Sequence, residues 1–211
     1  MNSMRAKDYE NKADADIWSE IKIGNKKAFD FIYNTYASIL LDYGKHFTTD
    51  VDLLEDVLQE TYLEIWFKKE KLNLHSSIKF YLFTSFRRKL FRKLGTVKKT
   101  VTIEIDEQFN FYGFSESVET KYIETELIKQ KKQLIETALQ KLAPRQKESV
   151  YLKYYQNLSF QEVAQVMSIT KKSAYKIIAK SLERLEKVLA EADYFDLYLF
   201  AIIFFQFFFE K

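Results

Sequence analysis

Apolar residues recur along most of this chain at spacings of three and four, which is the period of an α-helix with one buried face. The pattern predicts a short helix from Ile17 to Ile23 that ends at Gly24, and a longer helix from Ala28 to Tyr43. A third helix is expected after Asp50. Its apolar face comprises Val51, Leu54, Leu58, Thr61, Ile65 and Trp66. On another face of it, carboxylates recur at every fourth position, namely Asp56, Glu60 and Glu64.

The stretch KFYLFTSFRRKLFRK, from Lys79 to Lys93, combines aromatic with basic residues and contains no acidic residue. It is expected to form a helix that starts after Ser76 or Ser77, runs to about Leu94 and ends at Gly95. At about 100° per residue, this helix has two apolar faces. One comprises Ile78, Leu82, Ser85 and Phe86, and the other comprises Phe80, Phe83, Arg87 and Phe91.

Two interpretations of the second face of this helix are open. Aromatic rings mixed with guanidinium groups are typical of single-stranded nucleic-acid binding, where bases stack on the rings and cations hold the backbone. Alternatively, neighbouring helices bury both faces and leave only Arg88, Arg92 and Lys93 in solvent. Composition alone favours neither interpretation.

The composition changes between residues 95 and 122, where β-branched, glycine and acidic residues replace the helical pattern. This segment is long for a connection inside one compact domain, so it predicts a linker between two domains. A single proline and four glycines are too few for the turns of a β-sandwich or barrel. We therefore expect an all-α protein with small helical domains at 17–94 and 123–189, a flexible linker at 95–122 and an apolar tail at 190–211.

The second domain contains the pattern of a helix-turn-helix. Pro144 suits the first position of a helix, where its missing N–H is not needed. Ser159 and Glu162 have the spacing of a capping box at the start of a second helix, 160–167. The three residues 168–170 then form a turn before a third helix. The inward positions of this third helix are Ala174, Ile177, Ile178, Leu182 and Leu185.

The outer face of the third helix carries most of the candidate chemistry of this domain. Its outward residues are Lys171, Lys172, Ser173, Tyr175, Lys176 and Lys180. Cations near the start of the second helix of a helix-turn-helix are placed to contact phosphates beside a DNA major groove. The alternative is an ordinary solvated lysine face on a three-helix bundle. Lysine contacts give affinity rather than base choice, so this face does not reveal a DNA sequence.

The tail DYFDLYLFAIIFFQFFFEK, from Asp193 to Lys211, is apolar on every face between Leu197 and Phe209. As a helix, that apolar run would span about 20 Å, which is less than the roughly 30 Å of a bilayer core. A membrane span is therefore not favoured, although interfacial attachment to a membrane stays open. We expect an autoregulatory or partner-binding extension.

Composition removes several classes of function. The chain has no cysteine, which excludes disulfides and thiolate metal sites and is consistent with a reducing cytosol. His46 and His75 have no partners at metal-ligand spacing, so both are expected to be surface residues, with no metal bound. No phosphate-binding glycine loop and no nucleophile with a nearby base can be assembled, so we expect neither an enzyme nor a cofactor nor a small-molecule substrate. The first twenty residues contain no apolar run, which argues against a secretory signal.

Two segments together resemble a known family. LLEDVLQETYLEIW, from Leu53 to Trp66, followed by a polar loop and SIKFYLFTSFRRKL, resembles region 2 of the sigma-70 family of bacterial RNA polymerase subunits. The segment from Leu142 to Ile178 resembles region 4 of the same family, in the right order and at the right distance. A chain of this length without a third domain between them is similar to the extracytoplasmic-function (ECF) subgroup. The resemblance covers about Asp30 to Leu189 and does not include the tail.

This resemblance implies a cytoplasmic sigma factor that binds core RNA polymerase and directs promoter recognition, DNA melting and transcription initiation, while the polymerase performs the catalysis. It implies core binding by Asp56, Gln59 and Glu60. The loop from Lys71 to Ser77 would capture melted bases of the minus-ten element. The minus-ten contacts would come from Phe80, Tyr81, Phe83, Arg87, Arg88, Arg92 and Lys93. The minus-thirty-five element would be bound by Lys171, Lys172, Ser173, Tyr175, Lys176 and Lys180. An anti-sigma factor is a further partner that the resemblance allows.

Some positions depart from the family pattern. Ser173-Ala174 stands where the family usually has Thr-Val, and Ile177 stands where an arginine is common, so sequence preference does not carry over. A stand-alone helix-turn-helix regulator is the alternative function. That alternative explains the second domain but leaves Asp56, Gln59 and Glu60 without a role.

Overall fold

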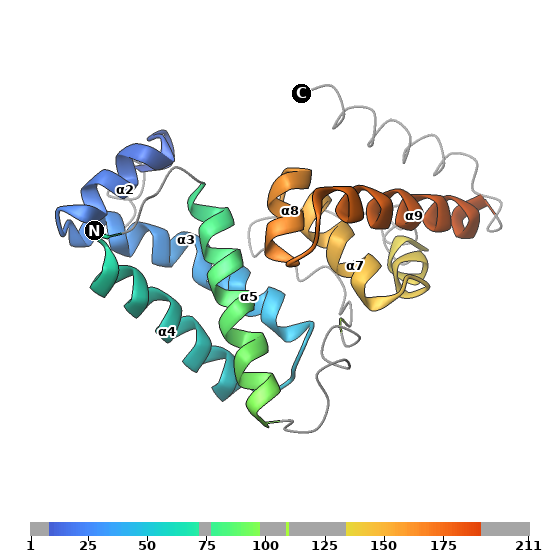
Figure 1. Cartoon of the computed structure of the whole chain (residues 1–211), viewed down its shortest axis with the longest axis horizontal. Helices are drawn as coiled ribbons and strands as arrows, with labels where there is room; N and C mark the ends of the chain where they lie inside the picture. Colours follow the sequence, from blue (N-terminus) through green and yellow to red (C-terminus); the bar gives the residue numbers. More distant parts are fainter. Residues whose placement is uncertain (1–8, 72–76, 98–108, 110–133, 191–211) are drawn as a thin grey trace, which may run out of the picture. The chain divides into compact units, whose positions relative to one another are not determined.

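The computed structural model describes residues 9–71, 77–97, 109 and 134–190, and these residues form helices and their connections without any β-strand (Figure 1). The all-α expectation is therefore confirmed. The chain divides into two compact units, one made mainly of residues 1–105 and the other mainly of residues 106–211.

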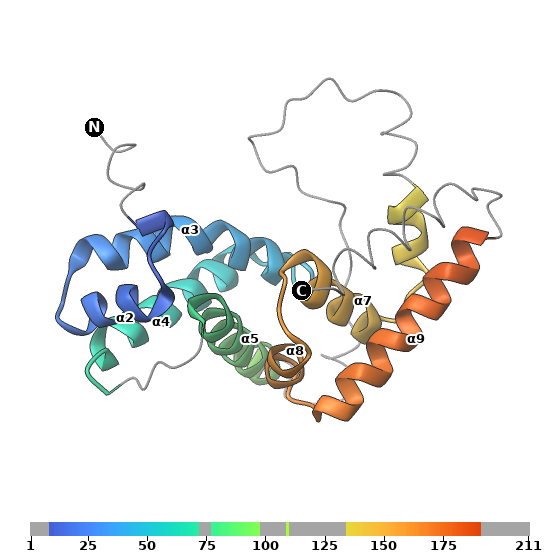
Figure 2. The same ribbon diagram turned by 90° about the horizontal axis from the view of Figure 1, so that it is seen from above.

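The helices that the structure describes in full in the first unit are α2 (Asp14–Lys22), α3 (Lys26–Lys45), α4 (Val51–Lys68) and α5 (Ile78–Val97). Helix α3 contacts the other three, and α4 also packs along α5 (Figure 2). The largest side chains with almost no exposed surface form the core between them, and they include Trp18, Ile32, Tyr43, Leu54, Ile65, Leu82, Phe83 and Phe86. Because α5 contacts both α3 and α4, it is buried over a wide arc.

Local signals in the sequence set the ends of these helices. Gly24 has a φ of +84°, a conformation that favours glycine, and it separates α2 from α3 as predicted. The side chain of Asn25 caps α3 by accepting the N–H of Lys27, and Asp50 Oδ1 caps α4 by accepting the N–H of Leu53 at 3.0 Å.

Two features of the first unit differ from the expectation. Helix α5 continues to Val97, so the prediction that it ends at Gly95 is wrong. Gly95 lacks the positive φ of a glycine that ends a helix, and an internal glycine costs a helix only about 1 kcal/mol. His46 is only 6% exposed, so its expected surface position is also wrong. It caps the C-terminus of α3 between the buried residues Tyr43 and Phe47, where the end of the helix is packed into the unit.

Gly44 allows the close approach of α3 to its neighbours. A Cβ added at this position would lie 2.5 Å from Cδ2 of Leu54 and 3.1 Å from Cζ of Phe86. These side chains come from α4 and α5, so the missing side chain of Gly44 creates the space at the centre of the bundle where three helices meet.

The start of α5 is held by two capping groups. Oγ of Ser77 accepts the N–H of Phe80 at 3.1 Å, which confirms the predicted serine cap. Oδ2 of Asp14, in the first turn of α2, accepts the N–H of Ile78 at 2.8 Å. Two backbone N–H groups in the first turn of α5 thus have hydrogen-bond acceptors, and one acceptor, Asp14, comes from α2.

The second unit contains a helix at 134–140, then α7 (Pro144–Val150), a π-helical turn η2 (Tyr151–Tyr155), α8 (Phe160–Val166) and α9 (Lys171–Ala190). Pro144 occupies the first position of α7, as predicted. The far end of α9 packs on the 134–140 helix. This core comprises Ala138, Leu139, Leu142, Leu185 and Leu189.

Helices α8 and α9 form the predicted helix-turn-helix. The capping box is present, since the N–H of Ser159 donates to Oε2 of Glu162 at 2.8 Å and the N–H of Glu162 donates to Oγ of Ser159 at 3.2 Å. The buried side chains of this motif are Val163, Ala164, Met167, Ala174 and Ile178. Oγ1 of Thr170 caps α9 by accepting the N–H of Ser173, and Ser168 in the turn has a φ of 55°.

Most of the predicted linker and nearly all of the predicted tail lie outside the described residues. Phe109 is the one described residue between 98 and 133, and it is buried with its ring 6.0 Å from that of Tyr151. Within the described part of the chain, no helix combines the length and apolar character that crossing a membrane requires.

Candidate functional site

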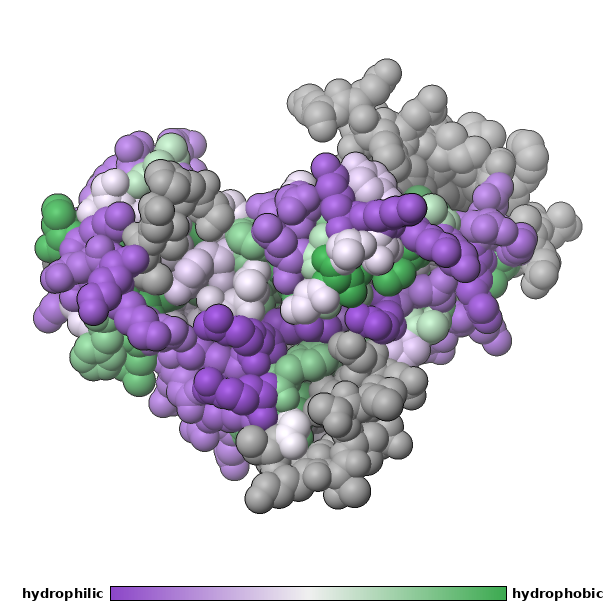
Figure 3. Space-filling view, in the orientation of Figure 1, coloured by the Kyte–Doolittle hydropathy of each residue, from purple (hydrophilic) through white to green (hydrophobic). Residues whose placement is uncertain are grey.

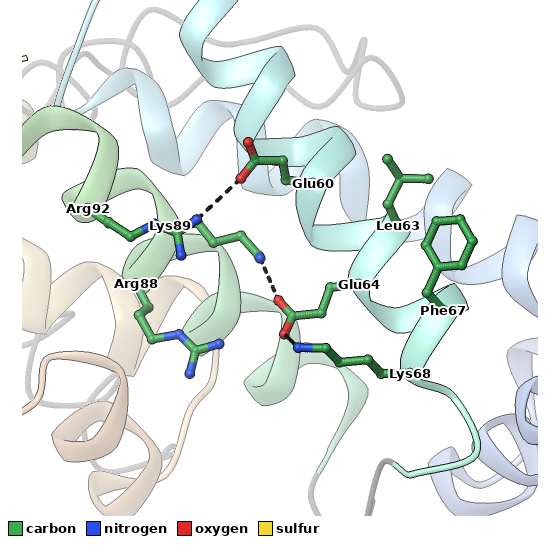
Figure 4. Close-up of a pocket in the computed structure, with 8 residues that line it drawn as sticks. All are labelled: Glu60, Leu63, Glu64, Phe67, Lys68, Arg88, Lys89 and Arg92. Atoms are coloured by element: carbon green, nitrogen blue, oxygen red, sulfur yellow. Dashed lines mark hydrogen bonds and ion pairs between the residues drawn. The ribbon is translucent and has the colours of Figure 1, made fainter. Parts of the chain in front are cut away.

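The acidic face of α4 is paired with the basic face of α5. Nζ of Lys93 lies 2.8 Å from Oε1 of Glu60 and 3.6 Å from Oδ2 of Asp56, and Nη2 of Arg92 lies 3.5 Å from Oε2 of Glu60. One turn further along, Glu64 binds Lys89 of α5 at 2.5 Å and Lys68 of its own helix at 2.7 Å. Figure 4 shows Glu60 and Glu64 reaching from α4 towards the cations of α5. We call this set of seven side chains the ion-pair ladder.

Within the ion-pair ladder, Glu64 interacts more strongly with its cations than Glu60 does. Hydrogen bonds from Lys68 and then Lys89 lower the pKa of Glu64 from 4.5 to about 2. Lys89 is only 7% exposed, so its ammonium group depends on the Glu64 carboxylate for a partner of opposite charge. In the neighbouring pair, the hydrogen bond from Lys93 lowers the pKa of Glu60, and the same bond raises the pKa of Lys93.

The ion-pair ladder brings together residues for which the sequence predicted different roles. Glu60 and Asp56 were expected to bind the polymerase, whereas Arg92 and Lys93 were expected to hold DNA, yet these four side chains pair with one another. Asp56 keeps 69% of its side chain exposed, and Gln59 is also exposed. The carboxylate of Asp56 and the amide of Gln59 therefore form the accessible part of the expected core-binding set.

A shallow groove of about 660 Å³ follows the ion-pair ladder between α4 and α5. Leu63 and Phe67 of α4 contribute its apolar surface and are 52% and 78% exposed, while Arg88 of α5 contributes an exposed cation (Figure 4). Neither apolar residue is among the site residues predicted from the sequence. A signal was available, because Leu63 and Phe67 lie four residues apart and both fall outside the face that contains Leu58 and Ile65.

Two of the predicted minus-ten residues, Phe83 and Arg87, are buried, so their predicted contact with DNA is wrong. Phe83 has no exposed surface and its ring lies 5.0 Å from that of Tyr43, so it belongs to the core of the first unit. Arg87 is 5% exposed and its guanidinium lies 4.1 Å above the ring of Phe91, where a cation–π contact replaces solvent. For this part of α5, the structure agrees with the alternative in which both faces are buried.

The remaining minus-ten candidates lie at the start of α5 and along its outer side. Phe80 and Tyr81 are half-buried, and the ring of Tyr81 meets Trp18 edge-on at 5.6 Å. Arg88 and Arg92 are exposed and Lys93 is half-buried. Residues 72–76 of the expected base-capturing loop lie outside the described part of the chain. Two aromatic residues and an arginine pair thus remain accessible in whole or in part on α5.

The minus-thirty-five candidates share one side of α9. Lys171, Lys172, Lys176 and Lys180 are all exposed, and we call these four residues the α9 lysine face. The visible side of α9 is largely hydrophilic in the space-filling view (Figure 3). Tyr175 stands among the lysines with 47% of its surface exposed. Ser173 is half-buried because its hydroxyl hydrogen-bonds Oγ1 of Thr170 at 2.8 Å, so it contributes to the cap of α9.

A helix-turn-helix whose second helix presents exposed lysines defines a DNA-binding class of protein. The described residues contain no group of three or more histidine, cysteine, aspartate or glutamate side chains that could hold a metal ion.

Known proteins place the chain more closely. The family profile "Sigma-70, region 4" matches residues 132–185. The ECF RNA polymerase sigma factor SigM of Bacillus subtilis (strain 168) is 25% identical over 157 residues, which cover 74% of this chain and 92% of SigM.

Two solved structures share the fold. CnrH, in complex with the cytosolic domain of CnrY, superposes with a TM-score of 0.53 at 19% identity, over 85% of this chain and 99% of that one. The sigma factor RpoE from Bartonella quintana, in complex with the anti-sigma factor NepR, gives a TM-score of 0.51 at 21% identity, over 78% and 98% of the two chains. Together, these similarities support a sigma-70 family sigma factor of the ECF subgroup, with a role in transcription initiation.

Proposed function

We propose that this sigma factor uses three separate surfaces in initiation: the outer side of α4 for core RNA polymerase, the start and outer side of α5 for the melted minus-ten strand, and the α9 lysine face for the minus-thirty-five duplex. The observation that carries the proposal is the α9 lysine face. Four exposed lysines at the first half of a helix-turn-helix recognition helix have no role in packing the unit, and they suit a polyanionic duplex.

Core polymerase would bind the exposed groups of α4. Asp56 offers a largely solvated carboxylate and Gln59 offers an exposed amide. Gln59 lies one helical turn before the exposed side chain of Leu63. A basic helical partner can satisfy both polar groups without breaking the coupled pair of Glu64 and Lys89. Glu60 would contribute less, because Lys93 and Arg92 already occupy its oxygens.

The melted strand would bind at the exposed groups of α5. Phe80 and Tyr81 are accessible enough for a base to stack on them, and Arg88, about two turns further along α5, supplies an exposed cation for the backbone. Arg92 and Lys93 would have to exchange carboxylates for phosphates, so they are secondary contacts. Phe83 and Arg87 are excluded by their burial.

Run-off transcription with core polymerase and a promoter library, with and without the protein, tests the proposal. We expect discrete, promoter-dependent start sites only when the protein is present. The same start sites with core polymerase alone would refute the proposed function. Transcription that is unaffected while the protein binds duplex DNA by itself would favour the alternative of a stand-alone regulator.

Variants separate the core-binding surface of α4 from the minus-ten surface of α5. Asp56→Ala with Gln59→Ala should weaken core binding about ten-fold or more, whereas Asp30→Ala, an exposed acid on α3, should leave it unchanged. Phe80→Ala should reduce open-complex formation and retain core binding. Equal loss of both properties in Phe80→Ala would indicate a folding defect and contradict the assigned role. Phe83→Ala supplies the comparison, because removing this core ring should destabilise the unit by about 3 to 5 kcal/mol.

Three further parts of the proposal follow from the family. The protein acts as a non-catalytic subunit, with the chemistry performed by the polymerase. It works in the cytoplasm, where a polymerase and its promoters are available. CnrH and RpoE are each seen in complex with another protein, CnrY and the anti-sigma factor NepR respectively. We therefore propose an anti-sigma partner for this chain, and copurification from cells that do not express its regulon tests that point.

A further inference from the structure

An aromatic stack stands in the middle of the α9 lysine face. The ring of Tyr175, on α9, lies parallel to the ring of Phe160, the first residue of α8, with centroids 4.0 Å apart and an interplanar angle of 18°. Nζ of Lys153 lies 4.9 Å from the centroid of Phe160, and Nζ of Lys171 lies 6.0 Å from that of Tyr175. The two rings are therefore flanked by cations.

The packing of the helix-turn-helix does not require this stack. Val163, Ala164, Met167 and Ala174 are buried apolar side chains of this motif, whereas Tyr175 is not. Tyr175 stays 47% exposed, and exposed lysines lie near it on α9, Lys171 one turn before it and Lys176 directly after it. The contact with Phe160 instead limits the rotamers of Tyr175 and holds a rigid apolar edge in a fixed place on an otherwise flexible lysine surface.

That edge has a chemical property that the lysines lack. Ammonium groups bind phosphates of any sequence, so the α9 lysine face by itself gives affinity without base choice. In the major groove, the C5 methyl group is the apolar feature that distinguishes thymine from the other bases, and an apolar side chain reads it by contact. A rigid ring presented beside phosphate-binding lysines is placed to make such a contact.

We propose that Tyr175, held in place by Phe160, is a specificity-determining residue that reads the C5 methyl group of a thymine in the duplex bound by α9. The inference rests on the proposed function of this face as the minus-thirty-five contact. It makes Tyr175 a base-reading residue and Phe160 a positioning residue, while the lysines remain backbone contacts.

Methyl removal tests the proposal. The holoenzyme, made from core polymerase and the full chain, first selects duplexes from a randomised library, and each thymine of the selected upstream element is then replaced by uracil. This change removes only the methyl group and retains the O4 acceptor. We expect one position at which uracil weakens wild-type binding about four-fold, the value of one buried methyl-sized group. Tyr175→Ala should bind the thymine duplex about four-fold more weakly and should no longer distinguish thymine from uracil there.

Matched variants make the result specific. Tyr175→Phe keeps the ring and should keep the methyl dependence, and Phe160→Leu, which loses the stack, should reduce it. Tyr155→Ala removes a ring that is also 47% exposed and also stacked, on Tyr151 at 5.2 Å, but that lies outside α9, and it should leave the dependence intact. Lys172→Ala and Lys176→Ala should weaken thymine and uracil duplexes equally.

Three outcomes would overturn the inference, and they differ in whether the proposed function also fails. If wild type is insensitive to methyl removal at every position while the lysine variants still lose affinity, methyl reading is wrong and the proposed function stands. The same holds if Tyr175→Ala keeps full methyl sensitivity. If the lysine variants bind every duplex as wild type does, the α9 face is not the DNA contact, and both proposals fail.

Discussion

Replacing Glu64 with glutamine should destabilise the first unit, because Lys89, which is only 7% exposed, would lose the carboxylate with which it pairs. The pKa of Glu64 falls from 4.5 to about 2 in the folded protein, which would correspond to about 3 kcal/mol at neutral pH if none of it were screened. The Glu64 side chain is 19% exposed, so solvent screening reduces this electrostatic contribution. We expect Glu64→Gln to lower the free energy of unfolding by about 1 to 3 kcal/mol.

The effect has a defined pH dependence. Because the folded-state pKa of Glu64 lies below its unfolded value, protonation favours the unfolded chain, and the stabilisation is complete above about pH 5 and lost as the pH falls towards 2. The difference between wild type and Glu64→Gln should therefore shrink between pH 7 and pH 3, to about 40% of its neutral value.

Tryptophan fluorescence during urea unfolding is the suitable assay. The chain has two tryptophans, Trp18 and Trp66, and both lie in the first unit, so the signal reports that unit alone. Asp42→Asn removes the carboxylate of an exposed pair with Lys45 and should change stability by less than about 0.5 kcal/mol. A loss for Glu64→Gln no larger than that of Asp42→Asn, or one that stays constant from pH 7 to pH 3, would refute the reasoning.

Three further predictions concern stability. Gly44→Ala should lower the free energy of unfolding by about 1 to 3 kcal/mol in the same fluorescence assay, because the new Cβ would collide with Leu54 and Phe86, whereas Gly95→Ala should raise it slightly. Ser168→Gly should stabilise the second unit by about 0.5 kcal/mol, seen as a higher melting temperature by circular dichroism, since its φ of 55° suits glycine; a lower melting temperature would contradict this. Ser159→Ala should cost about 1 kcal/mol in the same melt through loss of the capping box, and Ser159→Asp should recover most of it.

The sequence predicted the elements well where the signal was local. The capping box of Ser159 and Glu162, the cap at Thr170 and the first-turn position of Pro144 are set by residues within four positions of each other, and the structure has all of them. The α9 lysine face was also predictable, because one amphipathic helix fixes which of its residues point outward.

Features that depend on how two helices pack against each other could not be predicted from the sequence. Phe83 was assigned to a DNA-binding face because it lies beside, not within, the stripe of Leu82 and Phe86. Helix α5 touches both α3 and α4, and this wide burial includes Phe83. The acidic stripe of α4 and the basic stripe of α5 were each visible, but only the register between the helices shows that Lys93 meets Glu60.

The ion-pair ladder has a consequence for the protein before it meets any partner. Three carboxylates of α4 face three cations of α5, namely Lys89, Arg92 and Lys93, so these three positive charges are compensated at short range by the protein's own side chains. A polyanion attracted by uncompensated lysines would find them on α9 and few on α5. We therefore expect the acids of α4 to weaken non-specific DNA binding by α5, so that random DNA competes mainly for the α9 lysine face.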